Sequence, residues 1–367
     1  MTGLYIHIPF CARKCPYCDF CSTAFNKTLV QNYVDAVVRN IAHYSTDRIG
    51  LDTIYFGGGT PSLLTPQQVG QILHCAENSF VLHSPEITLE ANPCTVSLSK
   101  LSEYRSLGVN RLSFGIQSAS DSELVSLGRL HTFGRAEKAV NDAFDAGFDN
   151  ISCDLMIGIP DQTIQSLEYS IDALTNLPVQ HISAYMLKIE QGTPFDSDKI
   201  RNTVADDDLS SEMYLTTVQK LAAAGFEQYE ISNFAKPGFE SRHNMKYWIG
   251  ESYIGIGASA HSLFDGKRYF CPGDIGRFAS SPLQQTVSED DDPDKLEEYV
   301  MLGLRLTKGI SLSKLAELGA SDLSGLIAKA AAYERNDLCV LKDGVLRLTP
   351  KGFLVSNVLI SEFIQIL

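Results

Sequence analysis

Six short runs of branched apolar residues alternate with segments of helical apolar spacing along the first half of the chain. The runs lie at 4–8, 53–56, 87–91, 112–117, 151–157 and 182–187, and the helical segments at 30–41, 66–76, 98–107, 136–146 and 166–174. Such alternation predicts a parallel sheet with crossover helices, and six units are two fewer than a closed eightfold barrel requires. We therefore expect an α/β fold built on an open, partial (β/α)6 barrel.

The chain beyond the sixth unit changes character twice. A helix over 209–224 and a strand at 227–231 predict a seventh unit, and a passage rich in glycine and aromatic residues from 233 to 278 is expected to be irregular. The acidic run 288–294 predicts a boundary and the amino-terminal cap of the next helix, because carboxylates stabilise the positive end of a helix dipole.

The last part of the chain is expected to form a small, mainly helical domain of winged-helix type. Helices are predicted at 295–306, 312–318 and 323–335, a hairpin at 339–341 and 345–348 that turns at Asp343-Gly344, and a last helix from Pro350. Because the wing carries only Lys342 and Arg347 as basic residues, we interpret this domain as a packing domain.

Composition narrows the class of protein. A formal charge of -14 argues against nucleic acid as a partner, and no stretch approaches the roughly 20 apolar residues that cross a bilayer. The amino terminus lacks a basic segment followed by an apolar run, so a cytoplasmic location is expected. Nine cysteines include four between Cys11 and Cys21, a spacing that favours metal ligation over disulfides in a reducing compartment.

The cysteine pattern Cys11-x3-Cys15-x2-Cys18 follows the first expected strand, at the end where parallel barrels place their chemistry. Four thiolates would saturate a [4Fe-4S] cluster, whereas three leave one iron open to the amino and carboxylate groups of a ligand. The alternative from spacing alone is a zinc knuckle with Cys21 as the fourth ligand, in a scaffold without a redox role.

Further candidate ligand-binding residues follow the second to fifth expected strands. The turn Gly57-Gly58-Gly59-Thr60-Pro61 would let bare backbone approach a ligand and offer unshielded N–H groups, although a glycine-rich turn alone is a weak signal. Glu90, Gln117 and Asp154 fall at or near the carboxyl ends of the third, fourth and fifth strands, so these polar groups are expected to converge over one mouth.

These residues stand in motifs that resemble the radical S-adenosylmethionine superfamily, in particular its HemN-like branch. The motifs are Tyr-Ile-His-Ile-Pro-Phe-Cys at 5–11, Cys-Asp-Phe at 18–20, Leu-Glu-Ala-Asn-Pro at 89–93, Gly-Ile-Gln-Ser at 115–118, Leu-Gly-Arg-Leu-His at 127–131 and Asp-Leu-Met-Ile-Gly-Ile-Pro at 154–160. The resemblance covers nearly the whole chain. It implies a [4Fe-4S] cluster on Cys11, Cys15 and Cys18, and contacts to S-adenosylmethionine from Tyr5, Tyr17, Gly58, Gly59, Thr60, Glu90, Gln117, Arg129 and Asp154.

Two activities are known in this branch, oxygen-independent coproporphyrinogen III oxidation and the haem chaperoning ascribed to its HemW group. Oxidases of the branch carry a fourth cysteine where this chain has Phe20, and they have an amino-terminal extension, whereas ten residues precede Cys11 here. The segment 243–248 resembles the His-Asn-x-x-Tyr-Trp motif of the HemW group. The resemblance therefore favours a haem chaperone, with the oxidase as the alternative.

Imidazole is a common axial ligand of haem iron, so His243 is the leading haem-ligand candidate. His261 has a weaker claim, Met245 offers a thioether, and His7 is expected to be structural. A histidine that satisfies a core hydrogen bond is the alternative for His243.

The expected organisation is a radical S-adenosylmethionine partial barrel over 1–232, an irregular connecting region with the histidine motif over 233–288, and a HemN-like domain over 289–367. The partners that the resemblance implies are haem and a haem-acceptor protein such as a respiratory enzyme. Peripheral membrane association and a homodimer are compatible with it, and the sequence leaves cleavage of S-adenosylmethionine open.

Overall fold

The computed structural model describes residues 1–284, 287–290 and 294–367, and its main feature is a 12-stranded sheet. Six strands run parallel to their neighbours, in the order β1 (Thr2–Ile8), β4 (Gly50–Gly58), β5 (Val81–Ala91), β6 (Arg111–Gln117), β7 (Ile151–Ile157) and β8 (His181–Met186). They coincide with the six predicted runs to within a few residues at each end. The predicted α/β partial barrel is thus confirmed.

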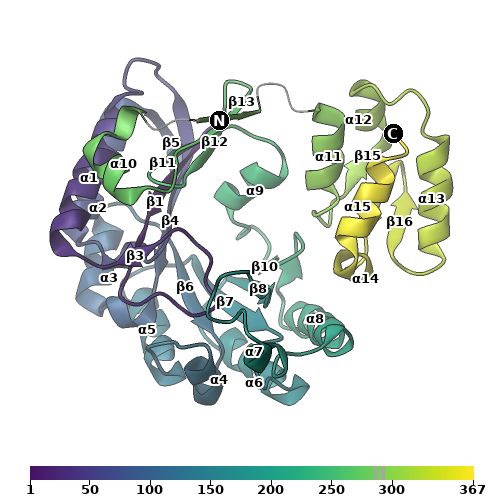
Figure 1. Cartoon of the computed structure of the whole chain (residues 1–367), viewed down its shortest axis with the longest axis horizontal. Helices are drawn as coiled ribbons and strands as arrows, with labels where there is room; N and C mark the ends of the chain where they lie inside the picture. Colours follow the sequence, from purple (N-terminus) through teal and green to yellow (C-terminus); the bar gives the residue numbers. More distant parts are fainter. Residues whose placement is uncertain (285–286, 291–293) are drawn as a thin grey trace.

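Helices cover the outer face of these strands, as Figure 1 shows. They are α1 (Lys27–Ala42), α2 (Pro66–Ser79), α3 (Leu98–Ser106), α5 (Phe133–Asp145), α6 (Ile164–Thr175) and α8 (Asp207–Ala223). Local signals fix where they begin; at α2, for example, Thr65 and Gln68 form a reciprocal capping box and Pro66 opens the first turn. The helix α4 (Asp121–Ser126) was not predicted, because six residues are too few to show a helical period.

The two faces of the parallel strands differ in chemistry. On β1, Leu4, Ile6 and Ile8 are fully buried against the outer helices, whereas the alternate positions carry Tyr5 and His7. Pairing continues this alternation across the sheet, so the inner face carries Thr53, Glu90, Arg111, Ser113, Asp154, His181 and Ser183, among others. Closed barrels fill this space with branched side chains. Here the interior is polar.

Antiparallel strands extend the sheet at the end beyond β8. Strand β10 (Asn233–Ala235) pairs antiparallel with β8, and β9 (Glu227–Gln228) pairs antiparallel with β10. The prediction of a seventh strand and helix unit is therefore only half right: the helix is α8, but the strand at 227–231 is two residues long and does not join β8 in parallel. Strand β10 instead pairs with the free edge of β8, so the segment at 227–231 cannot pair there.

At the other end, β11 (Tyr253–Ile256) pairs parallel with β1, and β12 (His261–Phe264), β13 (Lys267–Phe270) and β14 (Val287–Asp290) continue the sheet antiparallel. Helices α9 (Arg242–Trp248) and α10 (Ile275–Ser280) lie between these strands in sequence. The expectation of an irregular region from 233 was wrong, because elements of three to seven residues are too short to show periodicity. The sheet also continues past the boundary expected at residue 232.

The carboxyl-terminal domain contains the predicted helices and hairpin, with β15 (Ile310–Ser311) in addition and with the last predicted helix divided into α14 (Pro350–Leu354) and α15 (Ser356–Ile364). Its other elements are α11 (Lys295–Gly303), α12 (Leu312–Glu317), α13 (Ser324–Glu334), β16 (Cys339–Lys342) and β17 (Val345–Leu348). The hairpin turns at Asp343 and Gly344 with φ values of 53° and 74°, as a two-residue type I′ turn requires. Asp294 caps α11 as predicted, whereas residues 291–293 of the acidic run lie outside the described residues.

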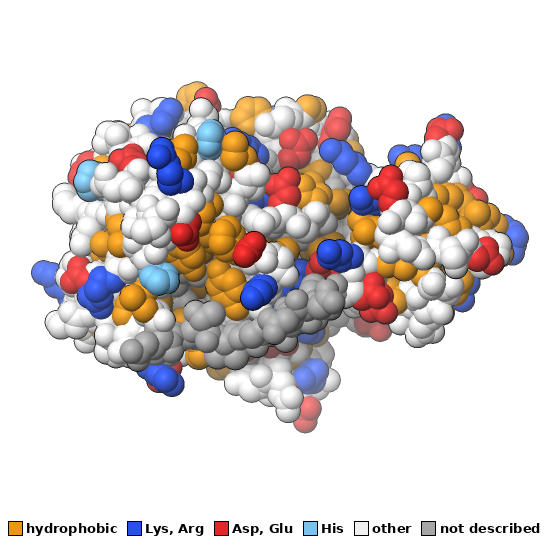
Figure 2. Space-filling model, turned by 90° about the horizontal axis from the view of Figure 1, so that it is seen from above, with side chains coloured by type: hydrophobic (Ala, Val, Ile, Leu, Met, Phe, Trp, Pro, Cys, Tyr) orange, Lys and Arg blue, Asp and Glu red, His pale blue; other side chains and the backbone are white. Residues whose placement is uncertain are grey.

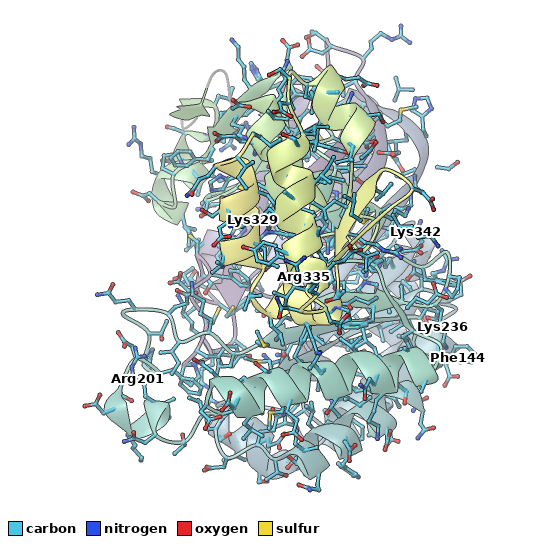
Figure 3. The ribbon with its side chains drawn as sticks, turned by 90° about the vertical axis from the view of Figure 1, so that its right-hand side faces the viewer. Phe144, Arg201, Lys236, Lys329, Arg335 and Lys342 are labelled. Carbon is cyan, nitrogen blue, oxygen red and sulfur yellow. The ribbon has the colours of Figure 1, made fainter. Side chains whose placement is uncertain are left out.

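On the face seen from above in Figure 2, charged side chains of the two signs are mixed. In Figure 3 the labelled basic residues of the carboxyl-terminal domain, Lys329, Arg335 and Lys342, are spread across it, and Lys329 is paired with Glu362. This pattern agrees with a packing role for the domain. Within the described residues, none of the helices combines the length and apolarity that crossing a bilayer needs.

Candidate functional site

The cysteine loop spans residues 12–22 and joins two short strands that pair with each other, β2 (Phe10–Cys11) and β3 (Thr23–Ala24). Cys11, Cys15 and Cys18 are all partly exposed and free of disulfides. Burial raises the pKa of the Cys18 thiol, and the nearby Cys15 and Cys11 raise it further, which shows that the three sulfur atoms lie near one another. The three predicted cluster cysteines are thus brought together at the carboxyl end of β1.

Two hydrogen-bond donors from other loops approach these sulfur atoms. Thr60 Oγ1 lies 3.7 Å from Cys11 Sγ, and Arg129 Nη1 lies 3.5 Å from Cys15 Sγ. A hydroxyl and a guanidinium both stabilise thiolate over thiol, and thiolate is the form that binds iron. The donor set therefore fits a cluster held by three thiolates.

The fourth cysteine of the loop points elsewhere. Cys21 Sγ donates to the carbonyl oxygen of Gly273 at 3.4 Å. Burial raises the pKa of the Cys21 thiol, while Lys14 and Ser259 oppose this shift. No three His, Cys, Asp or Glu side chains among the described residues are placed to hold a single metal ion. The contact of Cys21 with Gly273 disfavours a zinc knuckle that includes Cys21.

The glycine turn packs against the cysteine loop instead of presenting open N–H groups. The N–H of Gly58 donates to Glu90 Oε2, that of Gly59 to the carbonyl of Ile8, and that of Thr60 to the carbonyl of Phe10. A Cβ on Gly59 would lie 2.8 Å from the Phe10 oxygen, so glycine is required by this close approach. The expectation of unshielded donors here was wrong, because the backbone uses them to hold the cysteine loop.

Two carboxyl groups occupy the inner face near the cysteines. Glu90 accepts from Tyr55 through Oε1 at 2.9 Å and from Gly58 through Oε2 at 3.1 Å. Burial raises the pKa of Glu90 to about 7 and that of Asp154 to about 6, and the two carboxyl groups are near enough that Asp154 adds to the shift of Glu90. Clustered carboxyls with perturbed pKa values are typical of functional sites.

Gln117 and Arg129 meet Asp154 around Gly115. A Cβ on Gly115 would lie 3.1 Å from Arg129 Nη2, 3.2 Å from Gln117 Nε2 and 3.8 Å from Asp154 Oδ2. Gln117 has a φ of 81° and follows an irregularity in the β6 and β7 pairing, a strained backbone of the kind found beside functional sites. The predicted convergence of these groups is confirmed by the structure, while their ligand stays a prediction.

Tyr5 links the inner face to the cysteine loop. Its hydroxyl donates to His7 Nδ1 at 3.0 Å, and His7 Nε2 donates to the Cys21 carbonyl at 2.9 Å, so His7 is a neutral positioning residue, as expected. Tyr17 belongs to the cysteine loop, and its ring packs edge-on against Phe195 at a centroid distance of 5.9 Å. Burial raises the pKa of Tyr17, and Arg129 and Cys15 lie near enough to affect it as well.

His243 lies far from the cysteines, under the amino-terminal ends of β1 and β4. It is fully buried on α9, with Nδ1 bonded to Thr53 Oγ1 at 2.8 Å and Nε2 to Tyr247 OH at 2.9 Å. Burial lowers its pKa to about 3, which keeps the ring neutral. Both nitrogens are thus occupied, so ligation of haem by His243 would require α9 to release one of these bonds.

The rest of α9 closes the same end of the barrel, which we call the floor. Lys246 is 3% exposed, and its Nζ bonds Asp52, Glu251 and the carbonyl of Met1. Met245 is partly buried on the same helix, and His261 is exposed on β12 with its ring stacked on Phe270. Sequence reasoning missed Lys246, Tyr55 and Arg111, although the period-2 alternation of the strands could have placed Tyr55 and Arg111 on the inner face.

Comparisons with known proteins agree along the whole chain. The model of the radical SAM superfamily matches residues 5–174, and that of the HemN C-terminal domain matches residues 290–355. A heme chaperone HemW from Bacillus subtilis is 35% identical, with 99% of each chain covered, and one from Haemophilus influenzae is 33% identical, with 99% of this chain and 97% of the relative covered. The solved structure of coproporphyrinogen III oxidase (HemN) from Escherichia coli matches with a TM-score of 0.84 at 20% identity, over 99% of this chain and 89% of that one.

Proposed function

Since the chain belongs to the HemW family, with the radical SAM and HemN C-terminal domains of that family, we propose that it is a haem chaperone that binds haem and transfers it to an acceptor protein. The observation that carries the proposal is the match to curated HemW proteins over essentially their full length. We place the protein in the cytoplasm, and we propose an acceptor of the respiratory-enzyme type.

We further propose that Cys11, Cys15 and Cys18 hold a [4Fe-4S] cluster. Their grouping and the donors from Thr60 and Arg129 support this assignment. When bound, the cluster would supply one iron with an open coordination position for S-adenosylmethionine. The residues proposed to contact S-adenosylmethionine are Tyr5, Tyr17, Gly58, Gly59, Thr60, Glu90, Gln117, Arg129 and Asp154. For Gly58, Gly59 and Thr60 the contact would come from atoms other than their N–H groups.

The two carboxyls at the mouth, Glu90 and Asp154, are suited to bind a positively charged group. Glu90 and Asp154 have pKa values of about 7 and 6, so both lose their protons readily when a cation arrives. As carboxylates they would accept hydrogen bonds from an ammonium group and from ribose hydroxyls. Arg129 balances part of this negative charge beside the cysteines.

The haem ligand remains a prediction. His243 is the proposed haem ligand because of its motif. To bind haem it would have to give up one of its hydrogen bonds, to Thr53 or to Tyr247. The fold shared with coproporphyrinogen III oxidase leaves oxidase activity as the alternative, which the Phe20 substitution disfavours. We retain the division into a barrel over 1–232, a connecting region over 233–288 and a HemN-like domain over 289–367 as a proposal.

Titration of the anaerobically reconstituted protein with haemin tests the proposal. We expect a stoichiometric shift of the Soret band, followed by transfer of haem to an apo respiratory enzyme. A parallel assay with coproporphyrinogen, dithionite and S-adenosylmethionine should give no protoporphyrinogen. Absence of the Soret shift would overturn the chaperone assignment, and sustained protoporphyrinogen formation would replace it with the oxidase.

A further inference from the structure

An unpaired cation lies inside the barrel. Arg111 is the first residue of β6, faces the interior and is 1% exposed. Its Nε and Nη1 atoms are buried without a hydrogen-bond partner, and it forms no ion pair within 4.0 Å in the described part of the chain. Thr88, which pairs with Arg111 across β5 and β6, has a buried Oγ1 that is likewise unpartnered.

None of the described groups around Arg111 is paired with it directly. His181 and His243 lie in the same region of the interior, and burial lowers the pKa of both, so their rings are neutral; both are also bonded, His181 to Ser152 and Tyr229. Glu86, near the floor, uses Oε1 to accept the backbone N–H of His243. The carboxyls of Glu90 and Asp154 lie near enough for Arg111 to lower their pKa values, but neither forms an ion pair with it. Buried guanidinium atoms without hydrogen-bond partners are costly and call for a bound group.

Strand β6 runs from Arg111 to the mouth of the barrel. Glu90, Gln117 and Asp154 are partly exposed there, and the inner positions that separate them from Arg111 carry the small residues Ser113 and Gly115 on the same strand. A group that enters past the carboxyls would therefore meet Ser113 and then the guanidinium. Guanidinium and hydroxyl donors together match a carboxylate.

We propose that Arg111, assisted by Thr88, forms a carboxylate-binding subsite at the base of the barrel interior. The inference rests on the proposed function, since the carboxylate that fits a haem chaperone is a haem propionate. S-adenosylmethionine also carries a carboxylate, and internal water could satisfy the donors without supplying charge. Binding of the S-adenosylmethionine carboxylate and binding of water at Arg111 are therefore separate outcomes of the test.

The experiment compares haemin with haemin dimethyl ester, whose propionates carry no charge. Wild-type protein is expected to bind the free acid about tenfold or more tightly than the diester, as a charge-assisted bond requires. In Arg111→Gln the two affinities should become equal, and Arg111→Lys should keep a reduced preference. Because the ratio is taken within one variant, a general loss of stability does not imitate the effect.

Arg347→Gln, which removes an exposed arginine from β17, is the matched control and should retain the wild-type ratio. An unchanged ratio in Arg111→Gln would overturn the inference and leave water as the partner of the donors. If Arg111→Gln instead lost S-adenosylmethionine by calorimetric titration while keeping the ratio, the subsite would belong to that ligand. Failure of wild-type protein to bind haemin at all would reject the proposed function rather than this subsite alone.

Discussion

The mouth and the floor of the barrel are both polar, but their polar groups are satisfied to different degrees. At the mouth, the cysteines are partly exposed, and the carboxyls of Glu90 and Asp154 have raised pKa values. On the helix α9 that forms the floor, His243 and Lys246 are buried and every polar atom of their side chains has a partner, in contrast to Arg111 inside the barrel. Groups kept in an unfavourable state are poised for a ligand, whereas satisfied groups stabilise the fold.

The difference changes the meaning of the motif on α9. From sequence, the histidine motif suggests a haem site, but in the structure its histidine and lysine fasten α9 to Thr53, Asp52 and Met1. The motif thus has a structural task in this conformation. Substitutions at the mouth should therefore affect ligands first, and those at the floor should affect stability first.

The largest effect is expected at the cysteine loop. Cys18→Ser should remove nearly all iron and labile sulfide after anaerobic reconstitution, because a cluster held by two thiolates is not retained. Cys21→Ser is the control and should keep the full cluster, since Cys21 bonds Gly273 instead. Equal losses in the two variants would show that the loop holds metal through a different set of ligands.

At the floor, Lys246→Met should destabilise the protein by about 2–3 kcal/mol, because it leaves two carboxylates and a carbonyl without their shared cation. Urea denaturation of the cluster-free protein measures this change. The control Lys314→Met breaks an exposed pair with Glu317 and should cost about 0.5 kcal/mol or less. A small effect at Lys246 would remove the distinction between floor and surface.

At the mouth, Glu90→Gln should change the stability of the protein in the opposite direction to Lys246→Met, that is, it should stabilise the fold. The folded pKa of Glu90 is about 7, above its unfolded value, so the charged form is disfavoured in the folded protein above that pH. We expect the variant to be more stable than wild type by about 1–2 kcal/mol at pH 8, and to bind S-adenosylmethionine poorly. Thermal unfolding between pH 8 and pH 4 checks this, since the gain should shrink as the pH falls from about 7 and should disappear below the unfolded pKa of 4.5.

The smallest effect concerns the protonation of His243. Its folded pKa of about 3 lies below the unfolded value, so the unfolded chain gains a proton first and stability falls as the pH drops from about 6.5 toward 3. His243→Gln should remove this contribution, which amounts to about 1 kcal/mol between pH 6.5 and 5.5. Parallel slopes for variant and wild type would indicate that the ring is not buried in solution.

The sequence was sufficient to predict the elements that have a long apolar run or a specific turn motif. The six strands have continuous apolar runs, and Asp343-Gly344 supports only a tight hairpin, so both were predicted correctly. The convergence of Glu90, Gln117 and Asp154 followed from strand ends alone, because parallel strands share one carboxyl edge.

What the sequence could not supply depends on contacts between distant segments. The N–H groups of Gly58 and Gly59 are consumed by Glu90 and by the Ile8 carbonyl, which only the packed loops reveal. The satisfied state of His243 depends on Thr53, 190 positions earlier in the chain. The strands within 233–278 were missed because pairing with β1 and β8, rather than their own composition, makes them strands.

The parallel pairing of β1 with β11 sets an order of events during synthesis. Gly3 pairs with Tyr253, and Gly257 packs against Tyr33 and His7, so the first strand has an open edge until the segment around Tyr253 has emerged. Contacts between such distant residues form late, because the intervening chain must close first. The nascent polypeptide therefore carries Cys11, Cys15 and Cys18 beside an unfinished sheet until the segment around Tyr253 has emerged.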